Sequence, residues 1–343
     1  MKQTLVSTIS TVFRLFRDPG QQPGRRGTRM SSAIEWSPNA VGFAIALLLS
    51  ATADGAALKS MSLYGASTAL SANPMFKWAA SVTRVDYFSD HTQISNFSSV
   101  LVAPDVFITA GHGTPRNGST VAFLTNLTFG SNFTTSSNTY SISGTQRYPG
   151  FVFGDPTTID LGIGRTSSFV SGFTPITFAS IPMGGIGTMV DYGNIGDPST
   201  GEMPSLGDRM AGYAPRITDP TSSYPSSLYK FWDFNGVDSA NIALNVQGLQ
   251  GSSGSPIYDS IGNLDSLVTA GTNGIAIGDT VALDLNLPAV QSYLQPIIQD
   301  SWNRYNASIP EPTAIGLIAT GSLLALQRRR RSGGRGTDSG DED

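Results

Sequence analysis

A serine flanked by glycines is the first group in this chain whose surroundings could support covalent chemistry. The run from Gly251 to Pro256 reads GSSGSP and is followed by a short strand-like segment. Glycines on both sides let the backbone turn tightly and expose the Ser253 hydroxyl, and they allow successive amide groups to converge on a developing oxyanion. Because small-residue loops are common, this run alone does not single out a nucleophile.

The search for a base that could activate this hydroxyl is short, because the chain has 2 histidines. His112 follows the strand-like segment LVAPDVFITAG and stands among small residues that leave room for a fixed imidazole ring. His91 lies in the polar segment FSDHTQ. We therefore expect His112 to be the general base. A structural histidine is an equal alternative for this position considered alone.

A histidine base needs a partner for its second ring nitrogen. Asp160 opens an apolar alternation in TTIDLGIGR, and an aspartate at the edge of a buried strand needs such a partner. Asp155, beside Pro156, is the rival, but that pair is more typical of a turn. The order His112, Asp160, Ser253 is more specific than any of its parts. An esterase of the α/β-hydrolase type would need the serine before the histidine, in a GxSxG elbow. Here the histidine comes first and the run reads GSSGSP, which argues against that class.

The elements that must position these residues are short strands. The chain has 38 Gly, 20 Pro and 13% charged residues, with few strong helix formers outside its two ends. Strand-like runs such as SSVLVA, VFITA, FVSGFTPITFA, NIALNV and LDSLVTAG predict an all-β sandwich or barrels. A late helix is predicted at Pro288 to Ile298, where apolar residues share one face, with Pro296 kinking or shortening its last turn.

Together these segments resemble the chymotrypsin-like (trypsin-like) serine peptidase family. ITAGH is similar to its histidine motif, with Gly111 in place of the usual Ala; DLGIGR is similar to its aspartate segment, and GSSGSP to its GDSGGP. FVSGFTPITFASIP resembles the stretch that crosses between the barrels, and LPAVQSYLQPII the terminal helix. The resemblance implies two six-stranded antiparallel β-barrels, at about 72–180 and 181–300, with a C-terminal helix, in a peptidase domain at 54–309.

The resemblance also implies a role for each matching position. Ser253 would attack the peptide carbonyl, His112 would take and return its proton, and Asp160 would orient the imidazole. The amides of Gly251 and Ser253 would form the oxyanion hole. Neither a metal nor a cofactor is implied. Three further positions would contact an extended peptide substrate: Gln247, Thr269 and Gly271.

Departures from the family pattern change what is expected of the site. Ser252 stands where activated family members have the aspartate that pairs with a newly freed N-terminus, and no IVGG-like start precedes Phe76, which argues against cleavage-triggered activation. The resemblance implies that Gln247 would fall at the base of the primary specificity pocket, and its neutral amide gives no reason to prefer Arg or Lys. Ser255 replaces a Gly, a small change that we expect to be tolerated.

The two ends predict sorting signals. Residues 1–53 join an arginine-rich stretch to the apolar run AVGFAIALLLSATA and are predicted to be an export signal region, by the Sec or the Tat route, with Met1 or Met30 as the start. Residues 310–343 carry PEP, an apolar stretch and then four consecutive arginines at 328–331. This order resembles the PEP-CTERM sorting signal of Gram-negative bacteria, which implies transient membrane anchoring and cutting by an exosortase-type enzyme.

Charge and composition exclude several classes of function. Residues 54–312 hold 19 acidic and 10 basic side chains, which argues against a nucleic-acid partner. The absence of Cys excludes disulfides, zinc-thiolate sites and cysteine nucleophiles.

The leading hypothesis is an exported serine endopeptidase acting on proteins or peptides in the periplasm, outer surface or matrix of a Gram-negative-type bacterium. The alternative is a catalytically inactive surface or matrix-binding protein on the same fold.

Overall fold

The described part of the chain contains both groups of strands that the sequence predicts. The computed structural model describes residues 56–115, 122–130, 138–197, 199, 201–203, 208–218, 222–234, 241–249, 251–271, 279–309, 322 and 324–326. The predicted export segment at 1–53 lies outside these residues, as does the predicted sorting tail at 310–343 apart from four positions. In these ranges, no helix is long and apolar enough to cross a membrane.

The first barrel is a closed sheet of six antiparallel strands in the order β2-β3-β4-β7-β6-β5. Apolar side chains are buried on both faces of this sheet, among them the fully buried Phe107, Ile108 and Leu127. Strands β2 and β3 form a continuous ladder from Ala79 opposite Val100 to Tyr87 opposite Thr92. The strands are β2 (Ala79–Tyr87), β3 (Thr92–Ala103), β4 (Val106–Thr109), β5 (Ala122–Phe129), β6 (Asn138–Arg147) and β7 (Gly162–Thr166).

The second barrel is also closed, with the strand order β11-β12-β16-β15-β14-β8. Its core contains apolar side chains such as Trp232 and Ile257. It also contains a buried ion pair, in which Lys230 Nζ lies 2.6 Å from Asp265 Oδ1. The strands are β8 (Ile186–Asp191), β11 (Met210–Ile217), β12 (Tyr229–Trp232), β14 (Pro256–Tyr258), β15 (Leu264–Gly271) and β16 (Thr280–Asp284). The predicted fold class is confirmed: two six-stranded antiparallel barrels and a C-terminal helix.

Two of the strand-like runs in the sequence are not strands. FVSGFTPITFA crosses between the barrels and makes a single bridge, Phe178 to Leu264, because Gly172 (φ +69°) and Pro175 interrupt it. In NIALNV, only Val246 belongs to a strand, while Asn245 makes an isolated bridge to Tyr213 and its side chain donates to backbone carbonyls. The remaining runs fall in β3, β4 and β15 as predicted.

A small four-stranded sheet, not expected from the sequence, lies beside the second barrel. Its order is β10-β9-β1-β13. The first described residues form β1, whose Leu58 is fully buried in the core of the second barrel. Helix α3 follows and is tied to β11 by the Ser67 hydroxyl, which donates to Ala211 O. The elements are β1 (Ala56–Leu58), β9 (Ile195–Asp197), β10 (Gly201–Met203), β13 (Val246–Gly248), η1 (Met61–Leu63), α3 (Tyr64–Ser71) and η2 (Pro74–Phe76).

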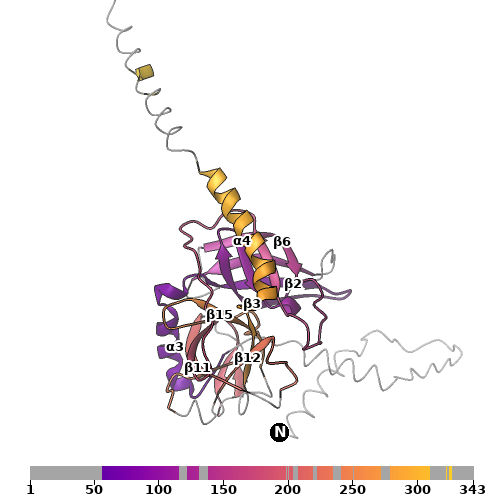
Figure 1. Ribbon diagram of the computed structural model, residues 1–343, viewed down its shortest axis with the longest axis vertical. Coiled ribbons are helices and arrows are strands. Elements are labelled where there is room, and N and C mark those ends of the chain that lie inside the picture. The colour runs from indigo at the N-terminus through magenta and orange to yellow at the C-terminus, as the bar shows by residue number, and fades with distance from the viewer. Residues whose placement is uncertain are drawn as a thin grey trace, which may run out of the picture. The chain divides into compact units, whose positions relative to one another are not determined.

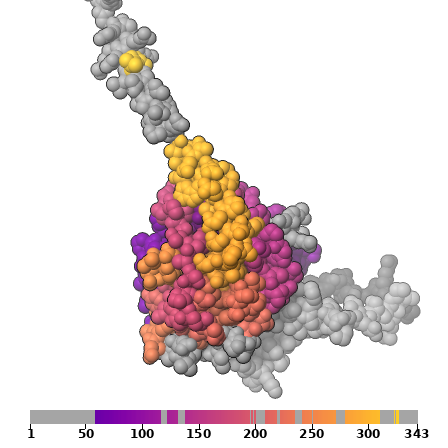
Figure 2. Space-filling view, in the orientation of Figure 1, coloured from indigo at the N-terminus to yellow at the C-terminus, as the bar shows by residue number. Residues whose placement is uncertain are grey.

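The terminal helix α4 (Pro288–Ser308) continues past its predicted end at Ile298, with Pro296 in its interior. The reason is tertiary packing: its second half rests on the first barrel, where the buried Ser301 hydroxyl bonds to Asp105 and Arg304 pairs with the same carboxylate at 2.7 Å. The helix crosses the outside of the barrels in Figure 1 and remains open to the surface on its outer side in Figure 2. A proline is tolerated where packing offsets the lost hydrogen bond.

Candidate active site

Strand pairing in the first barrel brings His112 and Asp160 together. His112 is the middle residue of the short helix η3 (Gly111–Gly113), which follows directly after β4, and Asp160 lies just before β7. Strands β4 and β7 are antiparallel neighbours, with Thr109 opposite Gly162. The end of one strand therefore meets the start of the other, and the two side chains face each other across that point.

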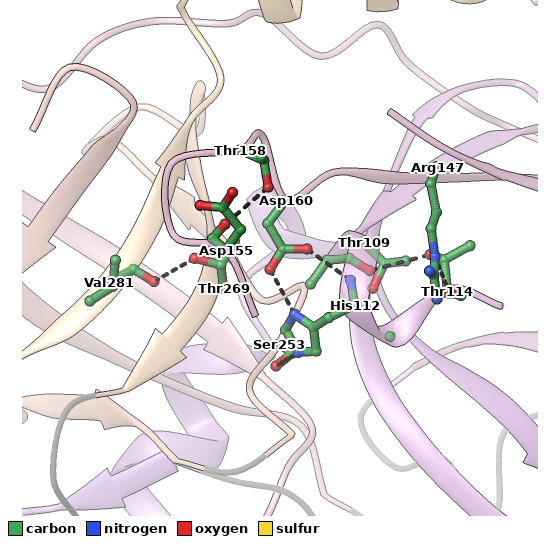
Figure 3. A network of polar contacts seen from close by, with 12 residues as sticks. Thr109, His112, Thr114, Arg147, Asp155, Thr158, Asp160, Ser253, Thr269 and Val281 are labelled. Atoms are coloured by element: carbon green, nitrogen blue, oxygen red, sulfur yellow. Dashed lines mark hydrogen bonds and ion pairs between the residues drawn. The ribbon is translucent and has the colours of Figure 1, made fainter. Parts of the chain in front are cut away.

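The imidazole of His112 lies between a carboxylate and a hydroxyl (Figure 3). Its Nδ1 is 2.7 Å from Asp160 Oδ2, and its Nε2 is 2.7 Å from Ser253 Oγ. The backbone N–H of His112 also donates to Asp160 Oδ1 at 2.8 Å, so the carboxylate is held at both oxygens. With Nδ1–H donating to the carboxylate, Nε2 is left as the acceptor for the serine hydroxyl.

The loop that carries Ser253 has the backbone shape that its glycines predict. Gly251 and Gly254 have φ angles of +83° and +89°, which side chains disfavour. The amides of Ser252, Gly254 and Ser255 donate to backbone carbonyls at 3.1, 2.7 and 2.8 Å. Within the described residues, the amides of Gly251 and Ser253 have no hydrogen-bond acceptor. These two donors, predicted for the oxyanion hole, are therefore available to a ligand.

The same loop is pressed against the first barrel. The Ser98 N–H on β3 donates to Ser253 O at 3.2 Å. A Cβ on Gly254 would collide with Ser98 O and with the Thr109 side chain, so glycine is required there for space as well as for its φ angle. The nucleophile candidate is thus positioned by both barrels, although it belongs to the second.

A cavity of about 220 Å³ opens beside His112. Four of its lining side chains, which we call the aromatic wall, are Phe151, Phe153, Tyr224 and Tyr229. Tyr229 donates its hydroxyl to Thr158 O at 2.6 Å. Burial, followed by the negative charge of Asp160, raises the pKa of Tyr229 and of Tyr224, so both phenols stay neutral. This wall was missed in the sequence, although the aromatic segment YPGFVFGDP just before Asp160 was a usable signal. The cavity is lined by His112, Phe151, Phe153, Gly154, Asp155, Pro156, Asp160, Tyr224, Tyr229 and Thr269.

The three positions predicted to contact substrate lie on strands of the second barrel or beside it. Thr269 lines the cavity from β15, at an irregularity in the ladder, and its Oγ1 donates to Val281 O at 3.3 Å. Gly271 ends β15. Gln247 is buried on β13, opposite Ala57 of β1, and does not line this cavity. Because residues 272–278 lie outside the described ranges, its predicted place in a specificity pocket stays a prediction.

The two rival candidates take no part in the hydrogen bonds that link Asp160, His112 and Ser253. His91 is exposed, stacks on Phe88 at 4.7 Å between ring centroids and contacts the neighbouring Asp90. Asp155 is in an exposed turn, where hydrogen bonds from Thr157 lower the pKa of its carboxyl. Neither group is brought to Ser253. Across the described ranges, no cluster of three His, Asp or Glu side chains could hold a metal ion.

No family model and no curated protein sequence matches this chain. Among solved structures it is similar to mouse neuropsin, a serine protease expressed in the limbic system of the brain, with 11% identity over 65% of this chain and 94% of that one, and a TM-score of 0.49. It is also similar to an inactivated protease paralogue of the scabies mite, with 13% identity over 66% and 96% and a TM-score of 0.47. The strand order of its own two barrels, with the terminal helix, gives this chain the trypsin-like fold.

Proposed function

We propose that this protein is a serine endopeptidase that hydrolyses peptide bonds through an acyl-enzyme. The observation that carries the proposal is the hydrogen-bonded series from Asp160 through His112 to Ser253. Both side-chain hydrogen bonds in this series are 2.7 Å long. A base in contact with a hydroxyl, and oriented by a third group, is the arrangement that makes serine a nucleophile at neutral pH.

Each residue has a defined part in this reaction. Ser253 Oγ attacks the carbonyl carbon while its proton passes to His112 Nε2, and Asp160 stabilises the imidazolium that forms. The amides of Gly251 and Ser253 donate to the oxyanion of the tetrahedral intermediate. His112 then gives the proton to the leaving amine, and water attacks the acyl-enzyme by the same route in reverse.

The substrate in this proposal is an extended peptide. Strand β15 ends beside the site, and its Thr269 to Gly271 segment would pair with a peptide backbone as an added strand. The aromatic wall of the cavity would take an apolar side chain on the acyl side of the bond. Gln247 gives no charge that would favour Arg or Lys. Export through residues 1–53, transient anchoring and exosortase-type cutting at 310–343 belong to the same proposal, as does an envelope or matrix location in a Gram-negative-type bacterium.

A fluorophosphonate probe tests the proposal, because it reacts rapidly with a serine hydroxyl that a base activates beside an oxyanion hole. The purified chain should be labelled, Ser253→Ala should not, and His112→Ala should be slower by at least about 10³-fold. His91→Ala is the matched control and should keep the parental rate. A peptide library should show no Arg or Lys preference.

Absence of labelling in a folded parent would instead favour the inactive binding protein on this fold. Labelling that survives Ser253→Ala would reject Ser253 as the nucleophile.

A further inference from the structure

A buried carboxylate behind the nucleophile loop has no part in the chemistry described above. Asp191 ends β8 and is 1% exposed. It accepts hydrogen bonds from the hydroxyls of Ser98, Ser252 and Ser255 at 2.7, 2.9 and 2.8 Å, and from the Tyr192 N–H at 2.8 Å. All three serines are fully buried. Four donors therefore converge on one carboxylate in the interior.

The charge of Asp191 is balanced by hydroxyls and not by a cation. Among the described residues, no Lys, Arg or His lies within ion-pair distance of it. A buried carboxylate is costly unless its oxygens are hydrogen-bonded, and a fully satisfied polar cluster fixes the geometry of the groups that join it. Such a cluster fixes whatever backbone carries its donors.

Two of those donors are in the nucleophile loop, defined as residues 251–255. Ser252 Oγ bonds to Asp191 Oδ2, and Ser255 Oγ bonds to Asp191 Oδ1, so one carboxylate holds the loop on both sides of Ser253. Ser252 Oγ also accepts the Leu249 N–H at 3.0 Å, which fixes the entry to the loop.

Strand register explains why this carboxylate reaches the loop. Strand β14 runs antiparallel to β8, with Ile257 opposite Met189, so the residue two before Ile257 falls beside Asp191. The third donor, Ser98, belongs to the first barrel, and its N–H donates to Ser253 O. Asp191 therefore connects the loop to both barrels.

The two loop serines are the two positions at which GSSGSP departs from GDSGGP. Ser252 takes the place of an aspartate, and Ser255 that of a glycine. In this chain the carboxylate is supplied by the neighbouring strand, and the loop supplies the hydroxyls that bind it. The paired departures are explained together by one acceptor, Asp191.

We propose that Asp191 is a positioning residue that holds the nucleophile loop in its working shape. It would present Ser253 to His112 and aim the amides of Gly251 and Ser253 at one point, with no need for a newly freed N-terminus. This inference rests on the proposed peptidase function and deepens it.

The test is the rate of fluorophosphonate labelling of the purified chain and its variants. Asp191→Asn removes the charge at constant shape and should slow the maximal labelling rate by about 10²-fold, as the loss of an oxyanion donor does, while the half-saturating probe concentration changes little. Ser252→Ala and Ser255→Gly each remove one hydroxyl and should slow labelling about tenfold.

A relocated carboxylate separates positioning from general stability. Asp191→Ser combined with Ser252→Asp returns the charge to the cluster from the loop side and should recover at least about tenfold over Asp191→Ser alone. Asp105→Asn is the matched control, because Asp105 is also buried and bonded to a serine hydroxyl but its partners are on α4 and β7. It should lower the melting temperature and keep the parental labelling rate.

The outcomes are separable. A parent that is not labelled rejects the peptidase function and this inference with it. A labelled parent whose folded Asp191→Asn variant reacts at the parental rate overturns this inference alone. If Asp191→Asn does not fold, Ser252→Ala and Ser255→Gly decide, and labelling of both within about twofold of the parent overturns it.

Discussion

The two barrels hold their shares of the candidate site in different ways. In the first, His112 and Asp160 lie at the ends of β4 and β7, and the ladder between these strands sets their separation. In the second, Ser253 lies on a loop between β13 and β14, held by hydrogen bonds to Asp191 and to the first barrel. A ladder tolerates many side-chain changes, whereas a loop held by buried polar groups depends on each of them.

The interiors differ in the same sense. The first barrel is filled by side chains such as Phe107 and Leu127. The second contains Lys230, whose Nζ lies 2.6 Å from Asp265 Oδ1 and 3.0 Å from Asp284 Oδ1. Burial raises the pKa of Asp265, and the Lys230 charge opposes that shift. The second barrel thus relies on polar partners both in its core and at its site.

The largest contrast is expected from one glycine in each barrel. Gly254→Ala forces a side chain into φ +89° and against the Ser98 carbonyl, so the loop must move and labelling should fall by about 10³-fold. Gly162→Ala meets chiefly the Thr114 side chain, which can rotate, and should cost about 1–3 kcal/mol of stability with little loss of labelling. Probe kinetics and urea unfolding measure both effects.

This contrast fails if Gly162→Ala impairs labelling more than Gly254→Ala does. The ladder between β4 and β7 would then be the more fragile support.

A second contrast concerns the interiors and depends on pH. Lys230→Met leaves Asp265 buried without its nearest cation, and the loss should reach about 3–5 kcal/mol at pH 8. The pKa of Asp265 is raised on folding, so the folded state binds the proton more tightly, and stability falls as pH rises above the ordinary carboxyl range. Urea unfolding at pH 5 and pH 8 should show the larger loss at pH 8.

The matched variants identify the cause. Adding Asp265→Asn to Lys230→Met should remove most of the pH dependence, and Leu127→Ala in the first barrel should cost about 2–5 kcal/mol at both pH values. Equal losses from Lys230→Met at the two pH values would show that Asp265 is not the group responsible.

The features that could be predicted from the sequence are those that neighbouring residues determine. The fold class and the segments around His112, Asp160 and Ser253 carry local patterns: a strand with small residues after it, an aspartate before an apolar alternation, and a serine between glycines. Each pattern lies within a few residues, and strand pairing then brings the first two together. The sequence was therefore sufficient for the parts of the site that neighbouring residues determine.

Features made by distant partners could not be predicted. The donors to Asp191 come from Ser98 in one barrel and from a loop beyond residue 250, and no local pattern marks that aspartate. Strand β1 has three residues, too few for a periodicity. The second half of α4 lies beyond Pro296, which indicates a helix end until packing against the first barrel is known.

The smallest expected effect tests how closely the first barrel fits its own pair. A Cβ on Gly111 would lie 2.9 Å from Asp160 Oδ1 and 3.0 Å from Leu161 N, so Gly111→Ala must shift a carboxylate that holds the His112 ring. The β4–β7 ladder can absorb a few tenths of an ångström, and labelling should fall only about threefold to tenfold, with little change in stability. Gly65→Ala, on α3 with nothing within 4 Å of its Cβ, is the control. A loss as large as that of Gly254→Ala would mean that strand pairing alone does not set the distance between Asp160 and His112, and that the first barrel is as dependent on single atoms as the second.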